Sequence, residues 1–119
     1  MLKGKERVSV VRQGDALLVR LSGEIDHHSA ADYRRQLDDL ICRHRPTVLR
    51  LDVAAVSFMD SAGLGLFMGR HALMSKIGGE LVLYRPGAVV MRIVRLSGME
   101  RMIKIEHQAS DHTKEGQGL

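Results

Sequence analysis

The stretch SFMDSAGLG, from Ser57 to Gly65, concentrates residue types that can do chemistry. A carboxylate and a hydroxyl, Asp60 and Ser61, stand next to each other just before the glycines Gly63 and Gly65. Each glycine costs a helix about 1 kcal/mol relative to alanine. Their presence in the first turn of a predicted helix therefore indicates that another backbone or a partner approaches closely.

Ser61 is open to two interpretations. As a plain N-cap, its hydroxyl would bond a backbone N–H one turn into the following helix, and most serines before helices do no more. As a phosphorylation site, it would present a phosphate to the exposed N–H groups and the positive end of that helix. Such a group would add about −2 charge beside Asp60 and change the surface without unfolding the chain.

Three kinds of enzyme loop match this stretch only weakly. A nucleophile elbow needs glycine two positions before the serine, where Met59 stands. A P-loop needs Gly-Lys-Ser/Thr, which is missing. The glycines at 63, 65 and 69 have one residue too many between them for a dinucleotide loop. We therefore expect no catalytic residue and no cofactor.

The segment GEIDHHSA, at 23–30, is the second place where chemistry could occur. It carries two carboxylates and two histidines, but adjacent histidines seldom hold one ion together, so no metal is expected. Two interpretations of Asp26 remain. It either holds local backbone N–H groups in a turn, or it offers an acidic contact to an arginine of a partner.

The spacing of apolar residues predicts the elements that must position these stretches. Strands are expected at 6–12, 16–22, 47–53, 80–84 and 101–106, and helices at about 29–43, 61–77 and 86–96. Loops are expected at 23–28 and 54–60. Alternating strands and helices imply parallel pairing, so only the first two strands, joined by a glycine turn, should be antiparallel. Strand 47–53 has one apolar and one mixed face, which favours helices on one side of the sheet and a sequential strand order.

This arrangement makes further predictions about individual residues. Ser29 should cap the first helix, with Asp32 completing a capping box. Both chemical stretches follow parallel strands, so they should be neighbours at the carboxyl edge of the sheet. Arg70 falls on the apolar side of its helix, where it either covers apolar surface with its stem or pairs with Asp60.

Length and composition limit the possible classes of protein. The 119 residues suit one domain, and 18 basic against 14 acidic side chains leave a charge of +4. Only 3% of the residues are aromatic and the basic residues are dispersed, so no nucleic-acid partner is expected. The single cysteine excludes an internal disulfide. No apolar run is long enough for a membrane span or a signal peptide, so a cytoplasmic location is expected.

The chain resembles the anti-sigma factor antagonists, which are single-domain STAS proteins. Four segments carry the resemblance, in family order and spacing: GEIDHHSA at 23–30, VSFMDSAGLG at 56–65, KIGGELVL at 76–83 and RLSGMERMIKI at 95–105. The resemblance spans about residues 6–106. The DHH triplet and the IGGE turn are closer to the anti-sigma F antagonists of sporulating bacteria than to the general-stress branch.

The resemblance implies an α/β fold with a STAS-type mixed sheet, in which an N-terminal antiparallel hairpin precedes parallel βαβαβ strands and the helices lie mainly on one face. A single STAS domain at 1–106 would be followed by a polar tail at 107–119. Family members bind a serine kinase that doubles as an anti-sigma factor and so release the sigma factor. The kinase then phosphorylates the antagonist, and a PP2C-type phosphatase reverses the modification. A free monomer with no membrane partner is expected.

The resemblance also assigns residues. The family's phosphorylated serine falls on Ser61, and its acidic contact to the kinase falls on Asp26. The expected partner-binding residues are Asp26, His27, Met59, Asp60, Ala62, Gly63, Leu64 and Gly65. Close relatives often have a second hydroxyl where this chain has Ala62. The alternative function is a STAS scaffold that binds partners in a stress-signalling complex without a phosphorylation cycle.

Overall fold

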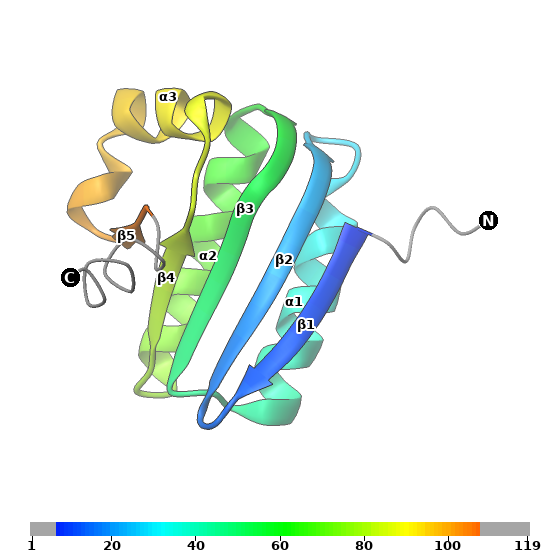
Figure 1. The fold of residues 1–119 in the computed structure, drawn as a ribbon, viewed down its shortest axis with the longest axis vertical. Helices are drawn as coiled ribbons and strands as arrows, with labels where there is room; N and C mark the ends of the chain where they lie inside the picture. Colours follow the sequence, from blue (N-terminus) through cyan, green and yellow to red (C-terminus); the bar gives the residue numbers. More distant parts are fainter. Residues whose placement is uncertain (1–6, 108–119) are drawn as a thin grey trace, which may run out of the picture.

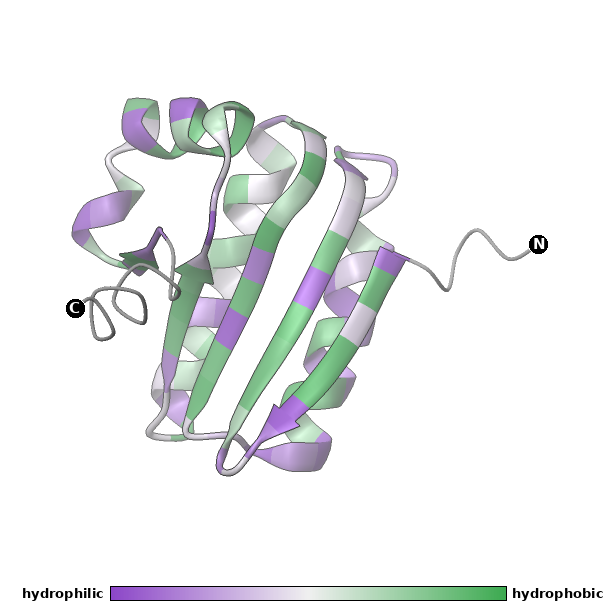
Figure 2. Cartoon of the chain, in the orientation of Figure 1, coloured by the Kyte–Doolittle hydropathy of each residue, from purple (hydrophilic) through white to green (hydrophobic). Residues whose placement is uncertain are grey.

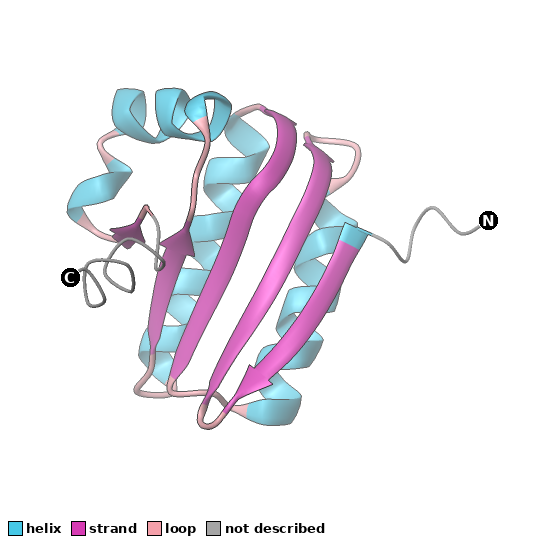
Figure 3. Cartoon of the chain, viewed as in Figure 1, coloured by secondary structure: helices cyan, strands magenta, loops and turns pink. Residues whose placement is uncertain are grey.

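A computed structural model describes residues 7–107, which form a five-stranded sheet with three helices (Figures 1 and 3). In chain order the elements are β1 (Val8–Gln13), β2 (Ala16–Ile25), α1 (Ala30–His44), β3 (Val48–Met59), α2 (Ser61–Lys76), β4 (Glu80–Tyr84), α3 (Ala88–Ser97), a 3-10 turn (Met99–Arg101) and β5 (Lys104–Glu106). The strand order is β1-β2-β3-β4-β5, with β1 antiparallel to β2 and all other pairs parallel. The predicted fold class is confirmed.

The core lies between the sheet and the two long helices. Helices α1 and α2 cover one face, and α3 lies across the carboxyl end of the sheet (Figure 1). Alternation in β3 explains this layering, because Leu49, Leu51 and Val53 are buried toward the helices while Arg50 points to the other face. On that open face, hydrophilic positions interrupt the apolar strands (Figure 2).

The helices are fixed by their apolar faces and by two glycines. In α1, Tyr33, Leu37 and Ile41 recur every four residues and are all buried. Gly78, at φ +80°, takes the left-handed conformation that ends α2. A Cβ on Gly79 would lie 2.9 Å from the carbonyl oxygens of residues 46 and 47, so only glycine allows this tight entry into β4.

Strands β2 and β3 are longer than predicted: residues 23–25 of the loop expected at 23–28 and residues 54–59 of the loop expected at 54–60 belong to strands, while 26–28 form a turn. The extra residues pair with each other, Ile25 opposite Met59, beyond two register shifts at which β3 has one residue more than β2. Such irregularities break the alternation of side chains between faces. The alternation of apolar and polar residues that predicts a strand is therefore absent where β2 and β3 approach the candidate site.

The other boundaries lie within two residues of those expected, except that β5 begins at Lys104 instead of 101, because a 3-10 turn occupies Met99–Arg101. No helix within residues 7–107 is long and apolar enough to cross a membrane. The predicted tail at 107–119 lies outside the described residues except for its first position.

Candidate functional site

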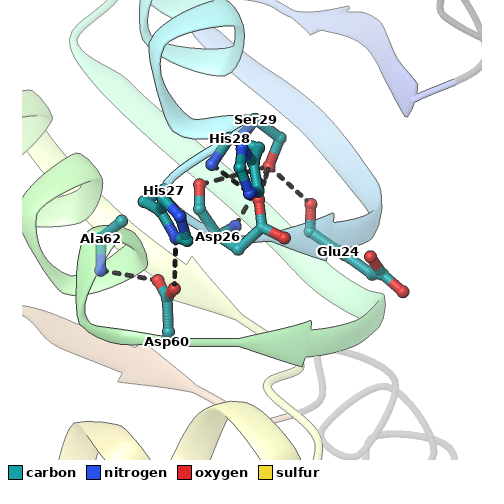
Figure 4. A network of polar contacts seen from close by, with 7 residues as sticks. All are labelled: Glu24, Asp26, His27, His28, Ser29, Asp60 and Ala62. Carbon is teal, nitrogen blue, oxygen red and sulfur yellow. Dashed lines mark hydrogen bonds and ion pairs between the residues drawn. The ribbon is translucent and has the colours of Figure 1, made fainter.

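The two chemical stretches meet at the carboxyl edge of the sheet, as predicted. The backbone N–H of Asp60 donates to the carbonyl of Ile25 at 3.2 Å, which joins the ends of β3 and β2. The side chains also meet, because Nδ1 of His27 lies 3.6 Å from Oδ2 of Asp60 (Figure 4). The turn before α1 and the start of α2 therefore form one surface.

Asp60, and not Ser61, caps α2. The backbone of Asp60 is extended (φ −112°, ψ −167°), and its Oδ1 accepts the Ala62 N–H at 2.8 Å. This is the geometry by which an N-cap carboxylate satisfies an orphan helix donor. The prediction that Ser61 is the cap is wrong, because the carboxylate one residue earlier already occupies that position.

Ser61 is the first residue of α2 and is exposed. Within residues 7–107, no hydrogen bond engages its hydroxyl. The oxygen stands at the positive end of a 16-residue helix, where an anion is favoured. The geometry allows modification of Ser61 without the loss of a cap or of a core contact.

Asp26 organises the neighbouring turn. Its Oδ1 accepts the backbone N–H groups of His28 and Ser29, each at 3.0 Å. These bonds, the one from Ser29 above all, hold the pKa of Asp26 below its ordinary value although partial desolvation opposes them. A carboxylate used in this way fixes the turn that carries His27 toward Asp60 (Figure 4).

The capping role predicted for Ser29 is wrong. Ser29 precedes α1, but its backbone is already close to helical (φ −100°, ψ −17°), and its hydroxyl donates backward to the Glu24 carbonyl at 2.8 Å. The expected capping box is also missing, because the Asp32 carboxylate contacts Arg35 and Gln36 on the helix surface. The carboxylate of Asp26 instead fixes the turn before α1, by accepting the backbone N–H groups of His28 and Ser29.

The remaining predicted contact residues divide into two groups. Gly65 is exposed, and Ala62 and Leu64 are half-buried. Met59 and Gly63 are buried against each other, and a Cβ on Gly63 would lie 2.3 Å from Cγ of Met59. Met59 and Gly63 therefore build the start of α2 from inside, whereas Ala62, Leu64 and Gly65 reach its surface.

Arg70 forms an ion pair, but with Asp38 and not with Asp60, the partner named in one of its two interpretations. Its Nε lies 2.8 Å from Oδ1 of Asp38 on α1, and the residue is 7% exposed. Burial lowers the pKa of this guanidinium and the Asp38 charge opposes that effect. The pair joins α1 to α2 and leaves Asp60 free for the edge of the sheet.

Sequence reasoning missed a buried charge on the open face. Asp52 is 1% exposed, and its carboxylate receives Arg85 at 2.8 and 3.3 Å and approaches Arg20 at 3.5 Å. In the sequence, the only indication of this buried charge was that Asp52 lies within the largely apolar strand predicted at 47–53. Phe58, which is 49% exposed beside the candidate site, was also missed because its strand was taken for a loop.

The model of the STAS domain matches residues 7–112 of this chain. An anti-sigma F factor antagonist of Paenibacillus polymyxa is 38% identical over 89 residues, which cover 75% of this chain and 76% of that protein. The fold agrees with the anti-sigma factor antagonist SpoIIAA solved in its unphosphorylated form (TM-score 0.73, 24% identity, 94% and 97% of the two chains covered). It also agrees with SpoIIAA of Bacillus, a cell fate determinant, in its phosphorylated form (TM-score 0.66, 23% identity, 91% and 97% covered).

The match to the domain model covers most of the chain, and the relative from Paenibacillus is matched over most of its length. The sequence matches and the strand order thus point to the same family. This chain belongs to the STAS-domain family of anti-sigma factor antagonists.

Proposed function

We propose that this chain binds a serine kinase that also acts as an anti-sigma factor, and that binding releases the sigma factor. The observation that carries the proposal is the exposed Ser61 hydroxyl at the start of α2, next to a turn fixed by Asp26. The name of the Paenibacillus relative supports the antagonist role. The chain acts by docking, in the cytoplasm, and performs no turnover of its own.

Phosphorylation of Ser61 is the proposed off switch. An exposed hydroxyl suits a surface that a partner covers and desolvates. A phosphate there would bring about −2 charge next to the Asp60 carboxylate, and an unpaired charge in a desolvated interface costs several kcal/mol. A PP2C-type phosphatase would restore the hydroxyl, and a relative solved in a phosphorylated form supports such a cycle.

The experiment begins with isolation of the kinase on tagged Ser61→Ala chain from the source cells. Purified kinase and ATP are then added to wild-type chain, and the modified residue is located by mass spectrometry. Ser61 is expected to carry the phosphate. Ser61→Glu is expected to bind the kinase at least about 100-fold more weakly than wild type, because the new charge lies inside the interface.

Ser75→Glu is the matched control, since Ser75 is exposed on the same helix far from its start. It should bind as wild type does. Modification at another residue, or full binding by Ser61→Glu, would overturn the switch and favour a partner-binding STAS module without a phosphorylation cycle.

A further inference from the structure

A groove of about 480 Å³ lies between the first halves of α1 and α2. Its walls come from both helices and from the turn before α1, and most of its lining is small: Ala30, Ala31, Ala62, Gly65 and Gly69, with Leu66 among them. His27, Arg34 and Arg70 supply the polar part of the lining. The groove runs from the Ser61 edge of the molecule down along α2.

Among residues 7–107, no contact requires Gly65 or Gly69 to be glycine. Gly63 needs to be glycine because Met59 fills the space of a side chain there. A Cβ on Gly65 or on Gly69 would instead meet no atom within 4 Å. Glycine destabilises a helix interior relative to alanine, so two unexplained glycines on one side of α2 indicate that the open space itself is used.

Of the two guanidinium groups in the groove, that of Arg34 is uncompensated within residues 7–107. Arg34 is exposed, and within residues 7–107 it makes no ion pair or hydrogen bond. Arg70 is 7% exposed and is paired with Asp38, which is not part of the lining. The lining thus contains two guanidinium groups and no carboxylate. An acidic side chain is its natural complement, because guanidinium and carboxylate groups pair with defined geometry.

We infer that the groove receives an acidic helix of the anti-sigma kinase, whose apolar side lies on the small residues of α2 and whose carboxylate pairs with Arg34. This inference rests on the proposed function and extends its contact surface. Continuity supports it, because His27 and Ala62 belong both to the groove and to the Ser61 edge. The small residues also let the backbone of a partner helix approach α2 closely, which would fill the open space beside Gly65 and Gly69.

The test uses the kinase isolated above and two variants that change the groove without touching Ser61. Gly69→Leu fills the space, and Arg34→Glu reverses the free charge. Each is expected to weaken kinase binding at least about tenfold in a titration of purified proteins. The midpoint of thermal unfolding should stay within a few degrees of wild type or rise. Arg34→Lys should recover most of the affinity lost in Arg34→Glu.

Two matched controls lie outside the groove. Ala72→Leu adds bulk to an exposed position of α2, and Arg95→Glu reverses an exposed charge on α3. Both should bind as wild type does. If Gly69→Leu and Arg34→Glu bind normally while Ser61→Glu does not, the groove assignment is overturned and the proposed function stands. A wild-type dimer that Gly69→Leu abolishes would show that a second copy fills the groove, and would also overturn the inference.

Discussion

Asp52 lies near the middle of β3 and Asp60 directly follows the end of this strand, yet the fold uses the two carboxylates in opposite ways. The Asp52 side chain is 1% exposed and that of Asp60 is 34% exposed. Asp52 receives a two-pronged contact from Arg85 and a longer one from Arg20. Asp60 holds one backbone N–H and approaches His27 at 3.6 Å.

The difference shows how the two surfaces of this small domain are built. Asp52 joins β2, β3 and the end of β4 on the face that no helix covers, so its charges serve the stability of the sheet. The hydrogen bonding that Arg85 donates to the Asp52 carboxylate is the main cause that raises the pKa of Arg85 above its ordinary value. Asp60 only sets where α2 begins, and its remaining oxygen faces the edge. The Asp52 carboxylate on the open face is thus buried and paired with arginines, whereas the Asp60 carboxylate at the edge is partly exposed.

The largest predicted effect follows from the locked carboxylate. Asp52→Asn keeps the shape of the side chain but leaves two arginines beside each other without their shared anion. The free energy of unfolding should fall by about 2–3 kcal/mol, less than for a fully buried pair because both arginines reach water. Urea denaturation measures the change.

Arg20→Ala provides the comparison within the same cluster. Arg20 is 56% exposed and contacts the carboxylate at 3.5 Å, so its removal should cost less than about 1 kcal/mol. If Asp52→Asn were as mild as Arg20→Ala, the cluster would be a solvated contact, and the contrast with Asp60 would disappear.

Substitution of Asp60 should separate its cap from its charge. Asp60→Ala removes the acceptor for the Ala62 N–H and should lower the free energy of unfolding by about 1 kcal/mol. Asp60→Asn keeps an equally good cap and should cost less than about 0.5 kcal/mol. Equal losses in the two variants would mean that the charge, and not the capping bond, stabilises α2.

The order of elements was predictable because it depends on short-range pattern. Alternation in 47–53 and the pair Gly78-Gly79 identified the sheet layers and the end of α2. The last residues of β2 and β3 were not predictable, since their pairing follows register shifts that no local pattern reveals. The same limit hid Phe58, whose exposure depends on that pairing.

The site was predictable in its position but less so in its internal contacts. Adjacent Asp60 and Ser61 both suit a cap, and only the backbone angles of the junction decide between them. Asp26 was recognised as a turn residue, but its capture of the N–H of Ser29 depends on how β2 ends. The partner of Arg70 comes from α1, so it could only be known once the two helices were packed together.

A third carboxylate gives the smallest and most local prediction. The pKa of Asp26 is lowered in the folded chain, so the folded state favours the charged form, and the resulting stabilisation is present above its ordinary pKa of 3.8. That contribution should fade as the pH drops below about 4 and vanish below the folded pKa. The amide signals of His28 and Ser29, which donate to this carboxylate, should titrate together in an NMR series. Asp26→Asn should abolish the shared titration, and its persistence in that variant would show that another group controls the turn.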